Sequence, residues 1–82
     1  MTNYPTSQLK ELVAGALKVS PENISAETAM ASTPAWDSLA HMDLVLSMER
    51  IYGIELSGEE IVDLVSMAAI FKILKSKGVE FS

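Results

Sequence analysis

Residues 36–56 read WDSLAHMDLVLSMERIYGIEL, a stretch that predicts one complete helix together with both of its ends. Asp37 has the kind of side chain that caps a helix start by accepting a hydrogen bond from a backbone N–H. Gly53 tolerates the left-handed conformation that ends many helices, and Ile54 supplies the hydrophobic contact that often follows such an end. The sequence therefore predicts a helix from Ser38 to Tyr52.

This predicted helix has two apolar faces. Successive helical residues turn by about 100°, so we place one apolar group on the side that faces a core: Leu44, Val45, Met48, Ile51 and Tyr52, with His41 at the edge. A second group lies roughly opposite, among the charged residues Asp43, Glu49 and Arg50: Leu39, Met42 and Leu46. An apolar strip with a polar rim is typical of a protein-binding surface. The alternative is that a neighbouring helix covers part of the strip.

Three further helices are predicted around it. Apolar residues at helical spacing predict a helix over 6–19, with Thr6 or Ser7 as its cap. The stretch SGEEIVDLV at 57–65 begins with a capping box, which predicts a short third helix. Ser66 can cap a fourth helix that carries its own apolar stripe.

Residues 20–37 read as a long loop, because they carry at most one short turn, at Ser20 and Pro21. Ile24, Met30 and Trp36 are spaced along this loop, so we expect it to be pinned to a core. No run of residues alternates for long enough to predict a sheet. The expected fold class is all-α: a small four-helix bundle that forms a single domain over residues 1–82.

Composition excludes several classes of function. The 82 residues include no cysteine, so there is no disulfide or thiolate metal site, and the formal net charge is -5. An acidic domain repels nucleic acid and suits basic protein partners. No apolar run approaches the ~20 residues of a membrane span, and the N-terminus lacks a signal-peptide pattern. We expect a cytoplasmic, monomeric protein that is not an enzyme and binds no metal.

Ser38 stands apart from the other serines, because Asp37 already occupies the N-cap position. Ser38 is then the first helical residue, at a helix end that favours a phosphate group. Nothing nearby in the sequence predicts a base that could activate it as a nucleophile, since His41 points toward the core side. Ser38 is therefore better interpreted as a residue that another enzyme modifies.

The helix of residues 38–52, an acidic short helix after it, and VSMAAIFKIL at 65–74 together resemble the acyl carrier proteins. The resemblance covers nearly the whole chain. In that family an Asp-Ser-Leu motif opens the second of four helices, and its serine carries 4'-phosphopantetheine. A magnesium-dependent phosphopantetheinyl transferase attaches this arm from coenzyme A, and the terminal thiol holds the cargo as a thioester. The implied partners are that transferase and the enzymes that load, condense or transfer acyl groups.

The resemblance implies a role for several residues. Ser38 would be the attachment site and Asp37 the aspartate that assists the transferase and its metal. The partner-binding residues would be Leu39, Met42, Asp43, Leu46, Glu49, Glu59, Glu60 and Asp63. The last three are otherwise interpreted as a solvated face of the third helix.

Departures from the family pattern bear on the pathway. Ala35 stands where the bacterial fatty-acid carrier typically has glycine, and Ala40 and Arg50 stand where acidic residues are common. These differences count against the housekeeping fatty-acid carrier, whereas Trp36 and His41 resemble those of free-standing carriers dedicated to one specialised pathway. The expected function is to carry acyl groups in a fatty-acid, polyketide or related specialised pathway. An aminoacyl or peptidyl carrier is the alternative, and an unmodified helical interaction domain is a remote one.

Other residues have two interpretations each. Trp36 is either a hydrophobic plug that fixes the loop or a contact for the pantetheine arm. His41 is either a structural histidine or a group that tunes the arm or binds a partner. Met30, Met48 and Met67 either line an adaptable acyl pocket or belong to an ordinary core.

Overall fold

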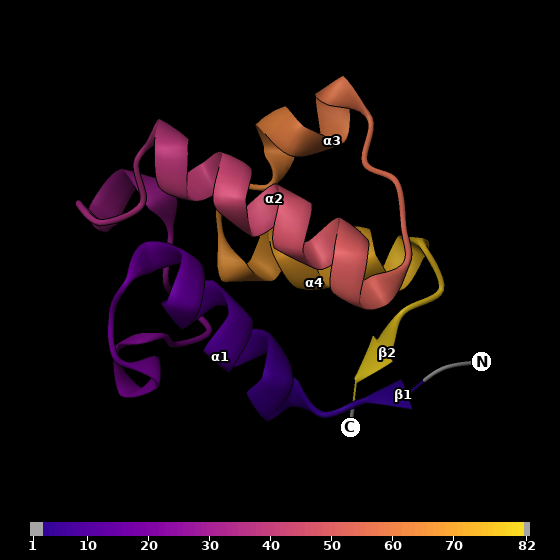
Figure 1. The fold of residues 1–82 in the computed structure, drawn as a ribbon, viewed down its shortest axis with the longest axis horizontal. Helices are drawn as coiled ribbons and strands as arrows, with labels where there is room; N and C mark the ends of the chain where they lie inside the picture. The colour runs from indigo at the N-terminus through magenta and orange to yellow at the C-terminus, as the bar shows by residue number, and fades with distance from the viewer. Residues whose placement is uncertain (1–2, 82) are drawn as a thin grey trace.

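The computed structural model describes residues 3–81 and contains, within them, the four predicted helices. Their bounds are Thr6–Leu17 (α1), Ser38–Tyr52 (α2), Gly58–Asp63 (α3) and Met67–Ser76 (α4). In Figure 1, α1 lies below α2, α4 runs behind α2, and the short α3 lies above it. This arrangement confirms the all-α fold class and the small helical bundle.

Helix α2 has the predicted bounds. The Asp37 carboxylate accepts a hydrogen bond from the Ala40 N–H at 2.8 Å, and Gly53 ends the helix with a φ of 62°. The Ile54 N–H closes this end on the Glu49 carbonyl at 3.2 Å. One prediction for its core face is wrong: Ile51 is 39% exposed. At this end of α2 the neighbouring Tyr52 is buried, and Ile51 lies at the boundary between the core and solvent.

Helix α1 differs from the prediction at both ends. Pro5, and neither Thr6 nor Ser7, occupies the N-cap position, and its fixed φ of −67° leads the chain into the helix. The helix ends at Leu17, because Lys18 adopts the left-handed conformation with a φ of 59°. The Val19 N–H then bonds the Ala14 carbonyl at 3.0 Å. A lysine therefore holds a backbone position that glycine adopts at less cost.

The caps of α3 and α4 are those that the sequence predicts. The Ser57 hydroxyl accepts a hydrogen bond from the Glu60 N–H at 3.1 Å, and the Glu60 carboxylate accepts one from the Ser57 N–H at 2.9 Å. The Ser66 hydroxyl accepts a hydrogen bond from the Ala69 N–H at 3.0 Å. Gly78 follows α4 with a φ of 87°. These contacts are local in sequence, which is why the pattern reveals them.

The long loop contains two 3₁₀ turns, Pro21–Asn23 and Met30–Ser32, so the prediction of at most one short turn is wrong. Contacts with the core order the loop further. Ile24 and Trp36 are both 2% exposed. The loop also pairs with the junction of α3 and α4, since the Met30 N–H bonds the Val65 carbonyl at 2.9 Å. The prediction of a pinned loop is confirmed. Ser20 precedes the first turn but does not cap it, because its hydroxyl donates to the Glu22 carboxylate at 2.5 Å.

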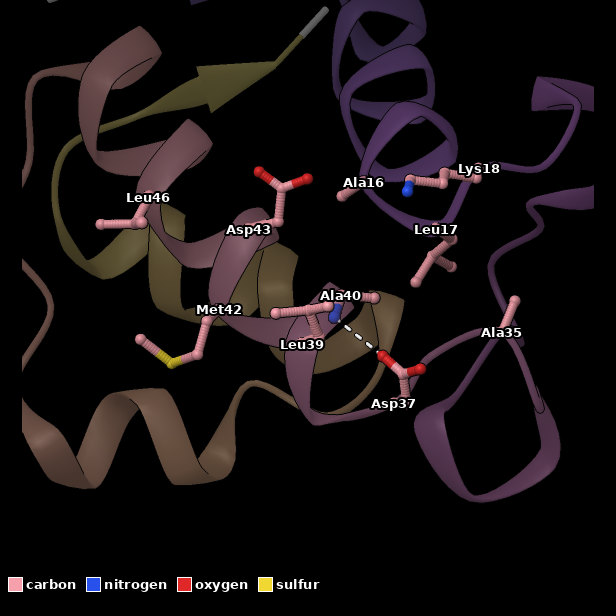
Figure 2. Close-up of a pocket in the computed structure, with 10 residues that line it drawn as sticks. All are labelled: Ala16, Leu17, Lys18, Ala35, Asp37, Leu39, Ala40, Met42, Asp43 and Leu46. Atoms are coloured by element: carbon pink, nitrogen blue, oxygen red, sulfur yellow. Dashed lines mark hydrogen bonds between the residues drawn. The ribbon is translucent and has the colours of Figure 1, made fainter.

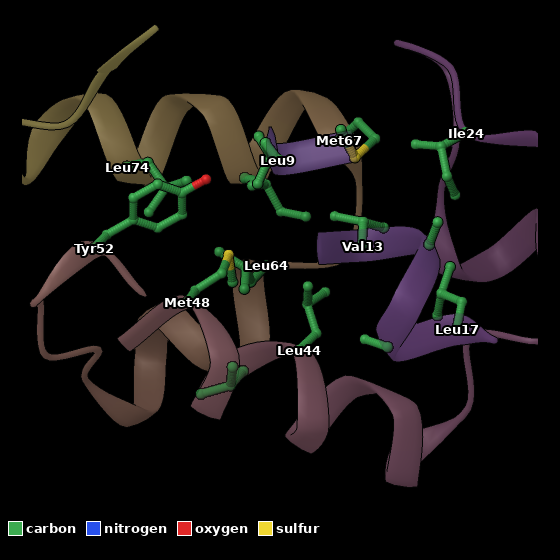
Figure 3. Close-up of a cluster of buried hydrophobic side chains, with 14 of the residues drawn as sticks. Leu9, Val13, Leu17, Ile24, Leu44, Met48, Tyr52, Leu64, Met67 and Leu74 are labelled. Atoms are coloured by element: carbon green, nitrogen blue, oxygen red, sulfur yellow. The ribbon is translucent and has the colours of Figure 1, made fainter. Parts of the chain in front are cut away.

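Figure 3 shows the core that these elements share, with side chains from α1, α2 and α4 meeting around Leu64. Leu9, Leu44 and Leu74 have no exposed surface. Met48 and Met67 lie in the same cluster at 0% and 2% exposure, and Met30 packs against it. The ordinary-core interpretation of these methionines is therefore the one that the structure supports.

Two strands of two residues each, Asn3–Tyr4 (β1) and Glu80–Phe81 (β2), were not predicted. They pair in parallel and bring the two ends of the described chain together (Figure 1). Edge-to-face ring contacts accompany the pair, with the Tyr52 ring centroid 4.7 Å from that of Tyr4 and 5.8 Å from that of Phe81. Two residues are too few for an alternating pattern, so only the fold reveals these strands.

Candidate functional site

The candidate site is the N-terminal end of α2. Ser38 is the first residue of the helix and is exposed, and no hydrogen bond to its hydroxyl occurs within residues 3–81. Asp37 is also exposed, and one of its carboxylate oxygens caps the helix on the Ala40 N–H. A helix start offers unpaired N–H groups and the positive end of the helix dipole. The site thus presents a hydroxyl and a carboxylate side by side in a field that stabilises negative charge.

His41 lies one turn into α2, and both of its ring nitrogens are occupied. The Trp36 indole N–H donates to His41 Nδ1 at 3.0 Å, and His41 Nε2 lies 2.8 Å from the Ile61 carbonyl oxygen. Because indole can only donate and a carbonyl can only accept, the imidazole carries its proton on Nε2. His41 is 8% exposed. It is therefore a structural group and not a base for Ser38.

The hydrogen bonds that link Trp36, His41 and Ile61 hold the site in place from the buried side of α2. They join the loop before Ser38 to α2, and α2 to α3. The plug interpretation of Trp36 is confirmed by its burial, which removes its ring from the surface that carries Ser38. A structural role is one of the two interpretations that the sequence offers for each residue, but the sequence does not predict that they contact each other or α3.

The second apolar strip of α2 is exposed, as predicted. Leu39 is 81% exposed, Leu46 59% and Met42 46%, so α3 does not cover them. Sequence reasoning missed Val62 on α3, which is 71% exposed. Its position near the end of a capped six-residue helix was the available signal, since the inward positions of so short a helix are few. Leu39, Met42 and Leu46 thus form an exposed apolar strip on α2, and Val62 is a further exposed apolar side chain on α3.

The acidic residues around this surface fall into two groups. Asp43, Glu59 and Asp63 are exposed. Glu49 is half-buried, and its carboxylate accepts a hydrogen bond from the Leu56 N–H at 2.9 Å. Glu60 caps α3 and forms an ion pair with Lys77 at 2.8 Å. Glu49 and Glu60 thus have structural contacts in addition to the partner-binding role that the family resemblance implies.

The charge state of Glu60 follows from these contacts. The hydrogen bond from Lys77, followed by that from the Ser57 backbone, lowers the pKa of the Glu60 carboxyl. The carboxylate therefore stays ionised to a lower pH than an isolated glutamate does. It joins the start of α3 to the end of α4.

A hollow of about 520 Å³ lies beside Ser38, between the end of α1 and the outer face of α2 (Figure 2). We call it the α1–α2 groove. Its apolar lining consists of Ala16, Leu17, Ala35, Leu39, Ala40, Met42 and Leu46, and its charged lining consists of Lys18, Asp37 and Asp43. The sequence did not predict this groove, because it requires the loop before Ser38 to lie against the end of α1.

Two kinds of site are not found in the described part of the chain. Within residues 3–81, no three His, Asp or Glu side chains are arranged to hold a metal ion. None of the helices found over the same residues is both long and apolar enough to cross a membrane.

Comparison with known proteins agrees with this geometry. The family model described as a phosphopantetheine attachment site matches residues 7–73. The chain is 29% identical to the acyl carrier protein of Thermosynechococcus vestitus, covering 85% of this chain and 86% of that one. It is 29% identical to the acyl carrier protein of Coprothermobacter proteolyticus, with 84% of each covered. It is 27% identical to polyketide-8 synthase acyl carrier protein 2 of Streptomyces avermitilis, with 93% of this chain and 87% of that one covered. The matched residues span all of α2 and α3 and most of α1 and α4, so this chain belongs to the family of proteins with a phosphopantetheine attachment site.

Proposed function

We propose that this chain is an acyl carrier protein whose 4'-phosphopantetheine arm is attached to Ser38. The observation that carries the proposal is the state of the Ser38 hydroxyl. It is exposed at the start of α2, makes no hydrogen bond within residues 3–81, and stands next to the Asp37 carboxylate. By contrast, the serines that do cap helices, Ser57 and Ser66, accept hydrogen bonds from backbone N–H groups through their hydroxyls.

The residues present fit the arm. A phosphodiester on Ser38 would carry one negative charge at the positive end of α2, where a helix start stabilises anions by about 0.3–1 kcal/mol when exposed. Asp37 has a second carboxylate oxygen beyond the one that caps the helix, and this oxygen suits the magnesium ion of a transferase. When bound, the arm supplies a terminal thiol that holds an acyl group as a thioester. The chain itself contributes a fixed attachment point.

Partner enzymes would bind the exposed surface next to that point. Leu39, Met42 and Leu46 supply the apolar contacts, and Asp43 with the acids of α3 supplies a negative rim. A negative rim speeds encounter with positively charged partners and fixes their orientation. We include phosphopantetheinyl transferase and enzymes of acyl transfer or condensation among these partners. The pathway that fits is one that carries acyl intermediates, as in fatty-acid or polyketide synthesis.

Mass spectrometry tests the attachment site. The protein is incubated with coenzyme A, magnesium and a broad-specificity transferase, and its intact mass is measured. We expect a gain of one phosphopantetheine in the natural sequence, with fragmentation placing it on Ser38, and no gain in Ser38→Ala. Ser7→Ala is a matched control, because Ser7 is also exposed in the first turn of a helix. Loading of Ser38→Ala, with its circular dichroism unchanged, would disprove the assignment.

A further inference from the structure

Arg50 lies on the same exposed face of α2 as the apolar strip of Leu39, Met42 and Leu46. Helical residues turn by about 100° each, so Arg50 lies about 40° from Leu46 around the helix and about 20° from Leu39. Figure 2 shows Met42 and Leu46 projecting from one side of α2, and Arg50 follows Leu46 by one turn. Its side chain is exposed and forms no ion pair within residues 3–81. An exposed guanidinium group therefore stands at the far end of the apolar strip.

The neighbouring Glu49 does not neutralise this guanidinium group. Glu49 is half-buried, and its carboxylate accepts a hydrogen bond from the Leu56 N–H at 2.9 Å. Consecutive helical residues lie about 100° apart, so Glu49 and Arg50 point in different directions. The carboxylate thus bonds the segment that follows α2, and the exposed charge at this end of the strip is positive.

The two ends of the exposed face carry opposite charge. Near Ser38, Asp37 and Asp43 are exposed, and the exposed Lys18 at the end of α1 offsets only one of them. Arg50 lies at the other end, twelve residues beyond Ser38 or about 18 Å along the helix axis. Exposed charges farther apart than about 8 Å are largely screened from each other at physiological salt. A partner therefore meets the two ends as separate charges of opposite sign.

We propose that Arg50 determines which enzymes accept this carrier: it favours a partner that places a carboxylate opposite the end of α2, and it disfavours a partner whose whole docking surface is basic. This inference rests on the proposed docking of partners on α2 and specifies their charge. A guanidinium group pairs with a carboxylate through two parallel hydrogen bonds. The same group repels a lysine or arginine placed against it. The partner surface that fits is basic beside Ser38, apolar along Met42 and Leu46, and acidic opposite Arg50.

Arg50 also has a structural interpretation, since a cation in the last turn of a helix stabilises the negative end of the helix dipole. Lys75 is a matched control for this effect. It is an exposed basic residue in the last turn of α4, and it forms no ion pair within residues 3–81. Figure 1 shows α4 behind α2, away from the exposed strip. Arg50→Glu and Lys75→Glu should therefore change the Tm alike, whereas only Arg50→Glu should change docking.

Loading kinetics test the proposal, with a phosphopantetheinyl transferase whose carrier-binding surface is basic as the probe. At low salt the kcat/KM for Arg50→Glu should exceed that for the natural chain about fivefold, and Lys75→Glu should stay within about twofold of it. Arg50→Gln should lie between the natural chain and Arg50→Glu. Added salt should reduce the difference, because it screens exposed charges. Equal kcat/KM for the natural chain and Arg50→Glu, or the same gain from Lys75→Glu, would overturn the proposal.

A charge swap identifies the complementary group on the partner. Single lysine-to-glutamate and arginine-to-glutamate variants are made across the carrier-binding surface of the transferase, and each is assayed with the natural chain and with Arg50→Glu. At least one transferase variant should load the natural chain faster than Arg50→Glu, which reverses the order expected with the natural transferase. If every variant keeps the original order, no carboxylate pairs with Arg50 and the proposal is wrong. Intact mass reads the attachment separately: a natural chain that gains no arm refutes the attachment to Ser38, and this inference with it.

Discussion

Replacing His41 by phenylalanine should destabilise the protein through lost hydrogen bonds, since a ring of similar size still fills the site. The change leaves the Trp36 indole N–H and the Ile61 carbonyl without their partner. An unsatisfied buried group costs about 1–3 kcal/mol. The Trp36 side chain is 2% exposed, so its indole N–H would stay unsatisfied at the full cost. Ile61 is half-buried, so water can reach its carbonyl. We expect a loss of about 2–3 kcal/mol in the free energy of unfolding.

Urea unfolding followed by circular dichroism measures this loss. For a domain of this size, 1 kcal/mol corresponds to roughly 4–8 °C in Tm, so His41→Phe should lower the Tm by about 10–20 °C. A double-mutant cycle with Trp36→Phe isolates the bond between the two rings. The double variant should lose less than the sum of the single variants, because it leaves no indole N–H and no ring nitrogen unpaired.

Two outcomes would refute this reasoning. A loss below about 0.5 kcal/mol for His41→Phe is typical of surface positions and would mean that the imidazole contacts do not hold the loop and α3 together. Additive losses in the cycle would mean that Trp36 and His41 stabilise the protein independently, each by its packing alone. Either result would remove the argument that the site is fixed from behind by this chain of hydrogen bonds.

Three further predictions test other features. Lys18→Gly should raise the free energy of unfolding by about 1 kcal/mol in urea titrations, since glycine adopts the left-handed conformation at no steric cost. Burial raises the pKa of Tyr52 from 10.0 to about 12, so stability should fall between these pH values, and Tyr52→Phe should reduce that slope. At neutral pH the same variant should be as stable as the natural sequence, because the hydroxyl is buried without a partner in the described chain. Leu46→Arg should weaken transferase binding in titration calorimetry without lowering the Tm, since Leu46 is 59% exposed.

Much of α2 was predictable because its signals are local. Asp37, Gly53 and the apolar positions between them lie within one stretch of sequence, so both ends of the helix and the exposed strip of Leu39, Met42 and Leu46 follow from spacing. The same holds for the capping box of α3. These features depend on contacts between residues at most five positions apart, and such contacts can be read without knowing the fold.

The missed features depend on residues that are distant in sequence. The strands β1 and β2 pair across almost the whole chain, and each is too short to show a pattern. The contact between His41 and the Ile61 carbonyl spans twenty residues. The α1–α2 groove needs the loop and the end of α1 to lie against α2. Ile51 was predicted in the core because helical spacing places it on the same side as Leu44 and Met48. Spacing does not show how wide the buried face is, because that width depends on which elements pack against the helix.

The two sides of α2 should therefore respond differently to mutation, and this difference is what a carrier requires. A tethered thioester is useful only if its attachment point stays in place while the arm above it moves between enzymes. The buried side of α2, with Leu44, Met48 and His41, fixes that point to the loop and to α3. The outer side, with Leu39 and Leu46, is covered by no element found within residues 3–81 and remains available for the arm and for partners. His41→Phe should thus lower stability more than binding, and Leu46→Arg should lower binding more than stability. Parallel losses of stability and binding in both variants would mean that the two sides of α2 do not have separate roles.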